Sequence, residues 1–163
     1  MNITLIAAIG KNNELGAYNK LLWYIPDDLK FFKKMTMNKI MVMGRNTFES
    51  LPGVLPGRKH LVLTSKDISG NDQVMVFDNI NNLFEYLDMI DYNSEVMIIG
   101  GASVYRQFID LADKMLITEI DCSSEEADSF FPDFDKLEWE CEELKSSSYK
   151  GINYRHVKYL RKR

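Results

Sequence analysis

The chain has 163 residues, of which 45% are hydrophobic and 27% charged, which is typical of a folded globular domain and excludes a disordered or fibrous chain. Its 20 basic and 24 acidic residues leave a net charge of −4, which argues against non-specific binding to nucleic acid. The two cysteines, Cys122 and Cys141, and the two histidines, His60 and His156, are too few for a structural zinc site or a multi-histidine metal centre. We therefore expect one domain spanning 1–163, with no metal.

The sequence has no feature of a secreted or membrane protein. No apolar run approaches the roughly 18 residues of a membrane span, and the N-terminus lacks the basic and apolar regions of a signal peptide. Cysteines without a C-x-x-C pair are typical of a reducing compartment. The sequence thus predicts a cytoplasmic protein that binds neither membrane nor nucleic acid, and the lack of an exposed apolar stripe predicts a monomer.

Apolar runs alternate with helical periodicity along the chain. Strands are expected at 2–9, 40–44, 60–65, 73–77, 95–100 and 114–120, and an antiparallel hairpin at 138–145 and 152–160. Helices are expected at 26–36, 46–51, 79–90 and 102–110. This alternation indicates an α/β fold with a largely parallel sheet covered on both faces. Because such sheets bind ligands beyond the carboxyl ends of their strands, the residues that follow each apolar run are the candidates for a site.

The first candidate segment, 16–26, has few strand or helix signals and contains Trp23. A segment of this kind suits a mobile lid over a binding site. The alternative is that Trp23 only anchors the segment to the core.

The helix expected at 26–36 places a carboxylate on its apolar side. At about 100° per residue, Asp28 falls on the arc of Phe32 and Met35, whereas Asp27 falls on the polar arc and complements the helix dipole. A carboxylate on an apolar face has to be desolvated, paired or directed into a cavity. Desolvation raises its pKa, which suits proton management near neutral pH, and two parallel N–H donors of a ligand can bind it. We predict that Asp28 is functional.

The strand expected at 40–44 leads into Arg45 and a helix that a proline and a glycine end after about one turn. Asn46 and Glu49 have the spacing of a capping-box variant. So short a helix contributes little to a core, but its free N–H groups, together with Arg45, would attract an anion. A plain strand-to-helix connection is the alternative.

Two further strand ends carry phosphate-binding features. Gly100 and Gly101 follow the strand at 95–100, and paired glycines let a phosphate approach the backbone. Thr64, Ser65 and Lys66 end another strand and add two hydroxyls and a cation. Routine turns are the alternative at both places.

A turn before the strand at 60–65 contains Arg58 and Lys59. An arginine here can bind a carboxylate through two parallel hydrogen bonds. The alternative is an exposed turn cation.

The order and spacing of these segments resemble those of the dihydrofolate reductase family over essentially the whole chain. The resemblance rests on LIAAI followed by LG, then W, PDDLKFFKKMT, MGRNTFESLPGVLPGRK, LTS, IIGGASVYRQF, LITEID and FFPDF. It implies an eight-stranded, mostly parallel sheet with an antiparallel C-terminal strand and four flanking helices. It also implies the NADPH-dependent reduction of 7,8-dihydrofolate to tetrahydrofolate, and the short length resembles the bacterial form of the family.

The resemblance implies roles for the candidate residues. Asp28 would hydrogen-bond the pterin and favour protonation at N5, with water as the proton carrier, as hydride reaches C6. Leu21 and Trp23 would complete the catalytic set from the lid, Thr118 would join the Asp28 network, and Arg58 would bind the α-carboxylate of the glutamyl tail. The other residues expected in the substrate pocket are Ile6, Ala8, Leu29, Phe32, Leu51, Leu55 and Ile99. Diaminopyrimidine antifolates would compete at Asp28.

The resemblance also implies an NADPH site. Arg45, Thr64 and Ser65 would surround the adenosine 2′-phosphate, which distinguishes NADPH from NADH, and Thr47 would help to hold the pyrophosphate. The Gly100–Gly101 peptide bond is expected to be cis. The expected cofactor-binding residues are Ala8, Leu15, Gly16, Gly44, Arg45, Asn46, Thr47, Leu63, Thr64, Ser65, Lys66, Gly100, Gly101, Ala102, Ser103, Val104 and Tyr105.

Two features depart from the family pattern, and two other functions stay open. Leu22 stands where the family commonly has proline before the lid tryptophan, and Leu116 stands where many members have an aromatic residue. One alternative is a reductase of similar fold that acts on another pterin or pyrimidine, as in the riboflavin pathway. The other is a module that binds both ligands without turnover. Asp28 together with Arg58 favours dihydrofolate reduction, because the tail carboxylate needs its own cation.

Overall fold

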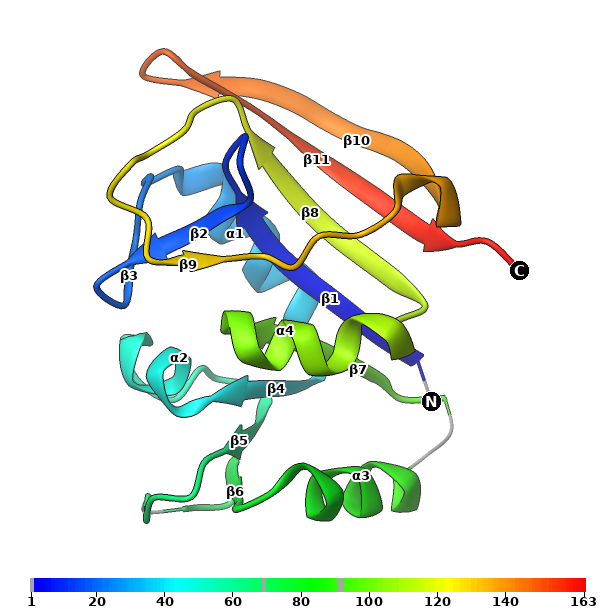
Figure 1. The fold of residues 1–163 in the computed structure, drawn as a ribbon. Helices are drawn as coiled ribbons and strands as arrows, with labels where there is room; N and C mark the ends of the chain where they lie inside the picture. Colours follow the sequence, from blue (N-terminus) through cyan, green and yellow to red (C-terminus); the bar gives the residue numbers. More distant parts are fainter. Residues whose placement is uncertain (1, 69, 91–92) are drawn as a thin grey trace.

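The computed structural model describes residues 2–68, 70–90 and 93–163. Within these residues, one sheet has eight strands: β1 (Asn2–Ile9), β4 (Ile40–Gly44), β5 (Lys59–Leu63), β6 (Val74–Phe77), β7 (Glu95–Gly100), β8 (Lys114–Ile120), β10 (Trp139–Tyr149) and β11 (Ile152–Arg161). The strand order is β10-β11-β8-β1-β7-β4-β5-β6, and Figure 1 shows the β10–β11 hairpin at one edge. Six strands run parallel to one another: β8, β1, β7, β4, β5 and β6. Strand β11 runs antiparallel to β8. The predicted α/β architecture is confirmed.

Helices cover both faces of this sheet. The described residues contain α1 (Pro26–Thr36), α2 (Arg45–Ser50), α3 (Ile80–Met89) and α4 (Ala102–Phe108), with 3₁₀ turns at Ile109–Leu111 and Lys136–Glu138. In Figure 1, α4 lies in front of the strands and α1 behind them. Along the described parts of the chain, no helix combines the length and the apolarity that crossing a membrane requires.

The two faces follow from the alternation of side chains along each strand. Leu5 and Ala7 of β1 belong to one core cluster, which includes Phe108 of α4. Ile6 points the other way, into a second cluster against which Phe32 of α1 packs. Residues of even number in β1 and β8 therefore face α1.

A second sheet was not predicted from the sequence. It comprises β2 (Glu14–Ala17), β3 (Lys20–Leu21) and β9 (Ser129–Phe130), in the order β3-β2-β9. The segment 16–26 therefore contains the end of β2 and all of β3, although its sequence carries few strand signals. These strands are too short to show periodicity, and β9 comes from a distant part of the chain. The backbone N–H of Asp128 donates to Gly16 O at 3.0 Å, so the segment is tied to this distant loop.

Glu14 is a buried acid that the sequence analysis did not single out. It is 1% exposed, and its carboxylate accepts hydrogen bonds from the backbone N–H groups of Asn12 and Ser124, each at 2.7 Å. Burial alone would raise the pKa of Glu14, but hydrogen bonds from the backbone N–H groups of Ser124, Glu14 and Asn12 bring that pKa below its usual value. The carboxylate thereby joins the loop before β2 to the loop after β8.

Replacing Glu14 by glutamine is expected to destabilise the fold at neutral pH by about 1–3 kcal/mol, because an amide nitrogen cannot accept one of these hydrogen bonds. Since the pKa is lower in the folded than in the unfolded state, the carboxylate stabilises the fold above its unfolded pKa. That stabilisation is lost as the pH falls from about 4.5 through the folded pKa. Urea unfolding at neutral and acidic pH measures both effects, with Glu125→Gln as an exposed control. Equal stability of Glu14→Gln and the parent chain at pH 7 would refute the assigned role.

Candidate active site

The carboxyl ends of three neighbouring strands meet at one edge of the sheet. In the pairing register, Gly44 of β4 lies beside Leu63 of β5, and Met43 of β4 lies beside Gly100 of β7. The turns that follow these strands therefore lie side by side. The register thus brings together the three segments that the sequence analysis singled out for phosphate binding.

The turn between β7 and α4 leaves little space for a side chain at Gly100. The Gly100–Gly101 peptide bond is cis, as expected, and Gly100 has a positive φ of 127°. A Cβ atom on Gly100 would lie 3.3 Å from Thr47 Oγ1 and 3.4 Å from the Tyr105 hydroxyl oxygen, and one on Gly101 would lie 3.6 Å from Thr47 Oγ1. Glycines here leave the backbone accessible beside a hydroxyl group, which is what close approach of a phosphate requires. The turn fits a dinucleotide pyrophosphate.

The capping box expected at Asn46 is wrong. Helix α2 begins at Arg45, with Gly44 as its N-cap and no side-chain capping bond, so Asn46 and Glu49 both lie inside the helix. Glu49 instead accepts a hydrogen bond from Arg45 Nη1 at 2.8 Å, in an ion pair one helical turn apart. Arg45 is therefore held at the start of α2 by a partner that is itself largely exposed.

The turn after β5 carries the third set of candidates. The Lys66 backbone N–H donates to Thr64 Oγ1 at 3.1 Å, which closes a short turn. Ser65 and Lys66 are exposed, and Thr64 and Leu63 are half-buried. The hydroxyls of Thr64 and Ser65 and the ammonium of Lys66 thus lie at or near the surface. They lie at the same edge of the sheet as Arg45, the first residue of α2.

Asp28 lies on the side of α1 that faces the sheet. Its side chain is 23% exposed, and Thr118 Oγ1 of β8 donates a hydrogen bond to Asp28 Oδ1 at 2.5 Å. Desolvation raises the pKa of Asp28 above its ordinary value. The Thr118 hydrogen bond and the neighbouring His156 oppose this rise, and the charge of Asp27 adds to it. The site thus holds a half-buried carboxyl group that binds protons more readily than a solvated aspartate.

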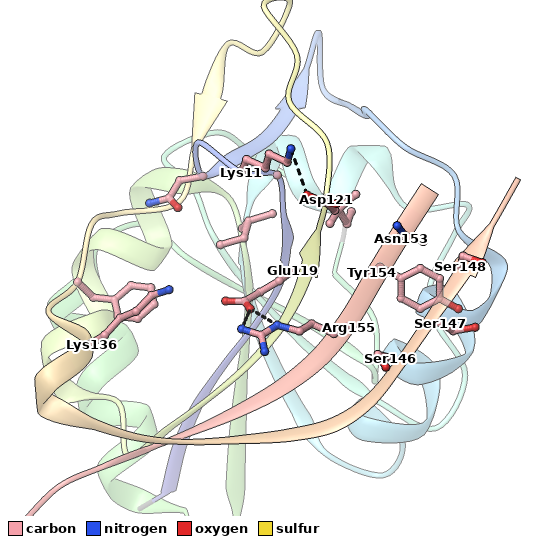
Figure 2. A pocket seen from close by; sticks show the side chains of 15 residues that line it. Lys11, Glu119, Asp121, Lys136, Ser146, Ser147, Ser148, Asn153, Tyr154 and Arg155 are labelled. Atoms are coloured by element: carbon pink, nitrogen blue, oxygen red, sulfur yellow. Dashed lines mark hydrogen bonds and ion pairs between the residues drawn. The ribbon is translucent and has the colours of Figure 1, made fainter. Parts of the chain in front are cut away.

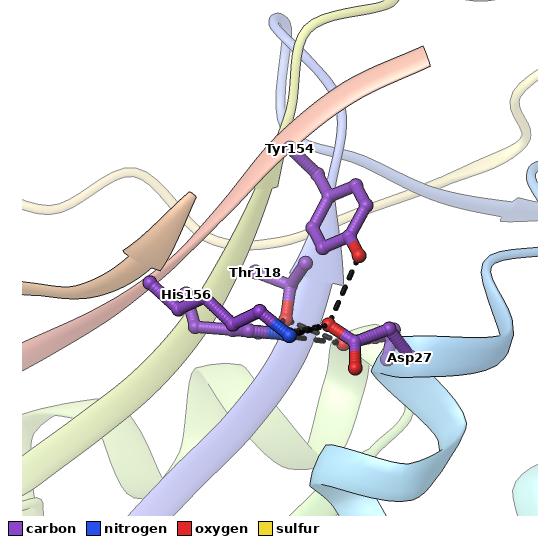
Figure 3. Close-up of polar contacts among 6 residues, drawn as sticks. Asp27, Thr118, Tyr154 and His156 are labelled. Carbon is purple, nitrogen blue, oxygen red and sulfur yellow. Dashed lines mark hydrogen bonds and ion pairs between the residues drawn. The ribbon is translucent and has the colours of Figure 1, made fainter. Parts of the chain in front are cut away.

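A network behind Asp28 was missed by the sequence analysis (Figure 3). His156 of β11 is 2% exposed, and its Nδ1 lies 2.8 Å from Thr118 Oγ1. Asp27 does more than complement the helix dipole, since it accepts hydrogen bonds from the Tyr154 hydroxyl and from Lys145 Nζ, each at 2.9 Å. The Lys145 ammonium lowers the pKa of Asp27. Period-two alternation, which puts residues 154 and 156 on one face of the strand, was the available signal.

The expected apolar walls are brought together with one exception. Ile6 and Ile99 belong to the core cluster beneath α1, Phe32, Leu51 and Leu55 pack against that cluster, and Ala8 packs on the neighbouring one. Leu29, also expected in the substrate pocket, is 43% exposed. Phe31, on the opposite flank of α1, stacks on the His156 ring with a centroid distance of 4.1 Å. Because the Phe31 flank of α1 packs against the sheet, Leu29 lies on the flank that faces away from the sheet.

Arg58 is not the exposed turn cation that the alternative interpretation requires. It is 6% exposed, its Nε donates to Pro56 O at 3.1 Å, and its Nη1 donates to Thr36 Oγ1 at 3.2 Å. Burial lowers the pKa of this guanidinium. Within the described ranges, the guanidinium donates to these two neutral oxygens, so its buried positive charge can bind an anionic ligand.

The two expected lid residues differ in position. Leu21 is 64% exposed at the end of β3. Trp23 is half-buried against a cluster of Ile25, Ile120 and Tyr154, and a Cβ atom on Gly10 would lie 2.6 Å from its ring. Trp23 is therefore anchored to the body of the protein. Leu15 also packs against the core, whereas Gly16 pairs with Leu21.

A groove of about 780 Å³ borders the surroundings of Trp23, since Ile120 and Tyr154 line it (Figure 2). Its lining includes Lys11, Glu119, Asp121 and Arg155 but none of the expected site residues. Its charges neutralise one another, since Lys11 Nζ lies 3.1 Å from Asp121 Oδ1 and Arg155 Nη2 lies 2.6 Å from Glu119 Oε1. The perturbed acid Asp28, the buried cation Arg58 and the glycine turn do not line this groove, and together they form the candidate active site.

Comparisons with known proteins identify the family of the chain. The family model of dihydrofolate reductase matches residues 2–161. The chain is 43% identical over 135 residues to a dihydrofolate reductase of Buchnera aphidicola (82% of this chain, 81% of the relative) and 39% identical over 166 residues to that of Neisseria gonorrhoeae (99% of each). It superimposes with a TM-score of 0.85 and 30% identity on dihydrofolate reductase from Enterococcus faecalis complexed with NADP(H) and RAB-propyl, over 99% of this chain and 97% of that one. The chain belongs to the dihydrofolate reductase family.

Proposed function

We propose that this protein reduces 7,8-dihydrofolate to tetrahydrofolate and uses NADPH. The observation that carries the proposal is the half-buried Asp28 carboxyl, hydrogen-bonded to Thr118 and carrying a raised pKa. The buried guanidinium of Arg58 favours a substrate with a carboxylate tail over the pterin or pyrimidine of a riboflavin-type reductase. A solved relative described as complexed with NADP(H) supports the cofactor.

In the substrate site, Asp28 accepts hydrogen bonds from the pterin N–H groups and favours protonation at N5, with water as the proton carrier. Thr118 holds the Asp28 carboxylate in place, and the residues around Ile6 and Phe32 exclude water from the ring. Arg58 binds the α-carboxylate of the glutamyl tail. Diaminopyrimidine antifolates bind at the same carboxylate, because they present a similar pair of N–H donors.

In the cofactor site, bound NADPH supplies the hydride. The Gly100–Gly101 turn and Thr47 hold the pyrophosphate, and Arg45 with the hydroxyls of the turn after β5 binds the 2′-phosphate. The glycine geometry and the shared edge of the sheet support this placement. The protein's task is to position two rings and exclude water.

We also propose that the chain acts as a single-domain monomer in the cytoplasm. The family match over residues 2–161 supports one domain. Cys122 and Cys141 are both free thiols, which is consistent with a reducing compartment.

The decisive experiment follows the loss of NADPH absorbance with dihydrofolate as the second substrate. Turnover that depends on dihydrofolate supports the proposal. Turnover only with a pterin or pyrimidine lacking a carboxylate tail would favour the riboflavin-type alternative. Tight binding of both ligands with stable absorbance would make the protein a non-catalytic module.

Replacing Arg45 by glutamine is expected to weaken NADPH binding by about tenfold and to leave NADH binding nearly unchanged, because only NADPH carries the 2′-phosphate. The effect is moderate, since Arg45 is partly exposed and paired with Glu49 in the free protein. Dissociation constants for both nucleotides, with Lys34→Gln on α1 as a control cation, provide the measurement. Equal losses for the two nucleotides would contradict the assignment.

A further inference from the structure

One row of side chains crosses the sheet directly under α1. The register pairs Ala8 of β1 with Thr118 of β8, Thr118 with His156 of β11, and His156 with Lys145 of β10. Residues opposite one another in adjacent strands point to the same face of a sheet. His156 therefore occupies the position between the hydroxyl that binds Asp28 and the outermost strand.

The hydroxyl of Thr118 couples Asp28 to His156. Thr118 Oγ1 lies 2.5 Å from Asp28 Oδ1 and 2.8 Å from His156 Nδ1, and it has a single proton to donate. While Asp28 is ionised, the hydroxyl donates to the carboxylate, and Nδ1 of His156 has to carry a proton and donate to Oγ1. When Asp28 is protonated, the bonds can reverse: Asp28 donates to Thr118, Thr118 donates to Nδ1, and the single proton of the neutral ring is then on Nε2. The protonation of Nδ1 thus follows the charge of Asp28.

The other ring nitrogen favours the first arrangement. His156 Nε2 is buried with no hydrogen-bond partner among the described residues, and Asp27 Oδ2 lies 3.6 Å away, too far for a hydrogen bond. A proton on Nε2 of the neutral ring would therefore lack an acceptor, whereas one on Nδ1 has Thr118. Phe31 covers one face of the ring and Tyr154 contacts it edge-on, so neither neighbour supplies an acceptor for a proton on Nε2.

We propose that His156 is a positioning residue of the active site: it directs the Thr118 O–H bond toward Asp28 and thereby sets how readily Asp28 takes up a proton during reduction. The proposal rests on the proposed function of Asp28. The charged and titratable groups that face His156 are Asp27 and Asp28 from α1, Lys145 from β10, and Tyr154 and Lys158 from its own strand. Of these, Asp28 alone shares a hydrogen-bonded hydroxyl with the ring.

His60 provides an internal reference for a spectroscopic test. Its Nε2 accepts a hydrogen bond from the Leu55 backbone N–H at 3.0 Å, and its Nδ1 lies 3.1 Å from Arg58 O. Because a carbonyl oxygen only accepts, the His60 proton resides on Nδ1. The chain has no other histidine besides His156, so the ring nitrogen signals of the two are easily assigned.

The first test records ¹⁵N spectra of ring-labelled histidine against pH in the ligand-free protein. Above the titration of Asp28, we expect a protonated Nδ1 on His156, and as Asp28 is protonated its ring signals shift at the same pH, while those of His60 do not. In Thr118→Val, we expect the His156 ring signals no longer to shift at the pH at which Asp28 is protonated. A proton on Nε2 alone at high pH, or a step that persists in Thr118→Val, would overturn the proposal.

The second test measures the pKa of Asp28 by ¹³C titration of its carboxyl carbon. We expect His156→Leu to raise that pKa by about 0.5–1 unit, because the donor behind Thr118 is lost. His156→Asn, whose amide can donate from the position of Nδ1, should recover most of the shift. Lys158→Met, on the same strand, should leave the pKa unchanged. An Asp28 pKa that is unchanged in His156→Leu would overturn the proposal. An equal change of that pKa in His156→Asn and His156→Leu would also overturn it.

These measurements separate the coupling from the proposed function. The alkaline limb of the pH–rate profile with dihydrofolate should move with the Asp28 pKa in the two His156 variants. If the titrations behave as expected but no chain oxidises NADPH with dihydrofolate, the proposed function is wrong and the coupling stands. If turnover is normal and the pKa of Asp28 is the same with and without His156, the proposed coupling is wrong and the proposed function stands. Should His156→Leu fail to fold, the Asn and Thr118→Val variants decide the matter.

Discussion

Asp28→Asn is expected to lower turnover near neutral pH by about 10²–10⁴-fold while the protein stays folded. Asparagine matches the shape of aspartate and still accepts a hydrogen bond from Thr118, so the packing under α1 is preserved. It cannot hold a negative charge beside the pterin, and protonation at N5 loses its support. The deficit should shrink as the pH falls, because substrate protonated in solution no longer needs the carboxylate.

Steady-state rates against pH provide the measurement, and urea unfolding verifies the fold. Asp88→Asn, an exposed acid on α3, serves as the matched control and should keep the parent rate at every pH. Parent-like activity of Asp28→Asn at neutral pH would remove Asp28 from the mechanism. A deficit of the same size at all pH values would show that the carboxylate acts in binding rather than in protonation.

Arg58→Gln is expected to weaken dihydrofolate binding by about ten- to a hundredfold, because the charge-assisted hydrogen bonds to one carboxylate are lost. The guanidinium is buried and bonded to neutral oxygens, so little water screens its charge. A dihydropterin without the glutamyl tail should bind both proteins alike. This contrast distinguishes recognition of the tail from a general effect on the pocket.

Quenching of tryptophan fluorescence measures the dissociation constants of both ligands, dihydrofolate and the dihydropterin without the tail. Lys59→Gln removes the neighbouring cation, whose ammonium bonds the Tyr86 hydroxyl at 2.6 Å, and should leave both affinities unchanged. Equal weakening of the tailed and the tail-less ligand by Arg58→Gln would mean that Arg58 supports the fold instead of the tail. A lower free energy of unfolding would accompany that outcome, because Arg58 also binds Thr36 Oγ1.

Local patterns predicted those parts of the site that depend on one element. The helical period placed Asp28 on the inner side of α1, and it lies there, half-buried. The strand-to-helix glycine pair predicted a turn without side chains, and the space around Gly100 agrees. The expected cap at Asn46 failed because a boundary one residue earlier puts Asn46 inside α2.

Features that join distant segments could not be predicted in this way. The small β2–β3–β9 sheet needs strands from both ends of the chain, and none of them is long enough to show alternation. The burial of Arg58 depends on Thr36, and the surroundings of Asp28 depend on Thr118, 90 residues away. A sequence shows that a turn contains an arginine, but not whether another element covers it.

Sequence alone therefore determined the α/β class, the facing of Asp28 and the glycine turn, because periodicity and backbone freedom are properties of neighbouring residues. Only the tertiary structure decided that Arg58 is buried, that Glu14 joins two loops and that His156 lies behind Thr118. The physical reason is that desolvation and hydrogen-bond partners depend on which strands are adjacent in the sheet, and the pairing of β8 with β11 sets the partners of Asp28.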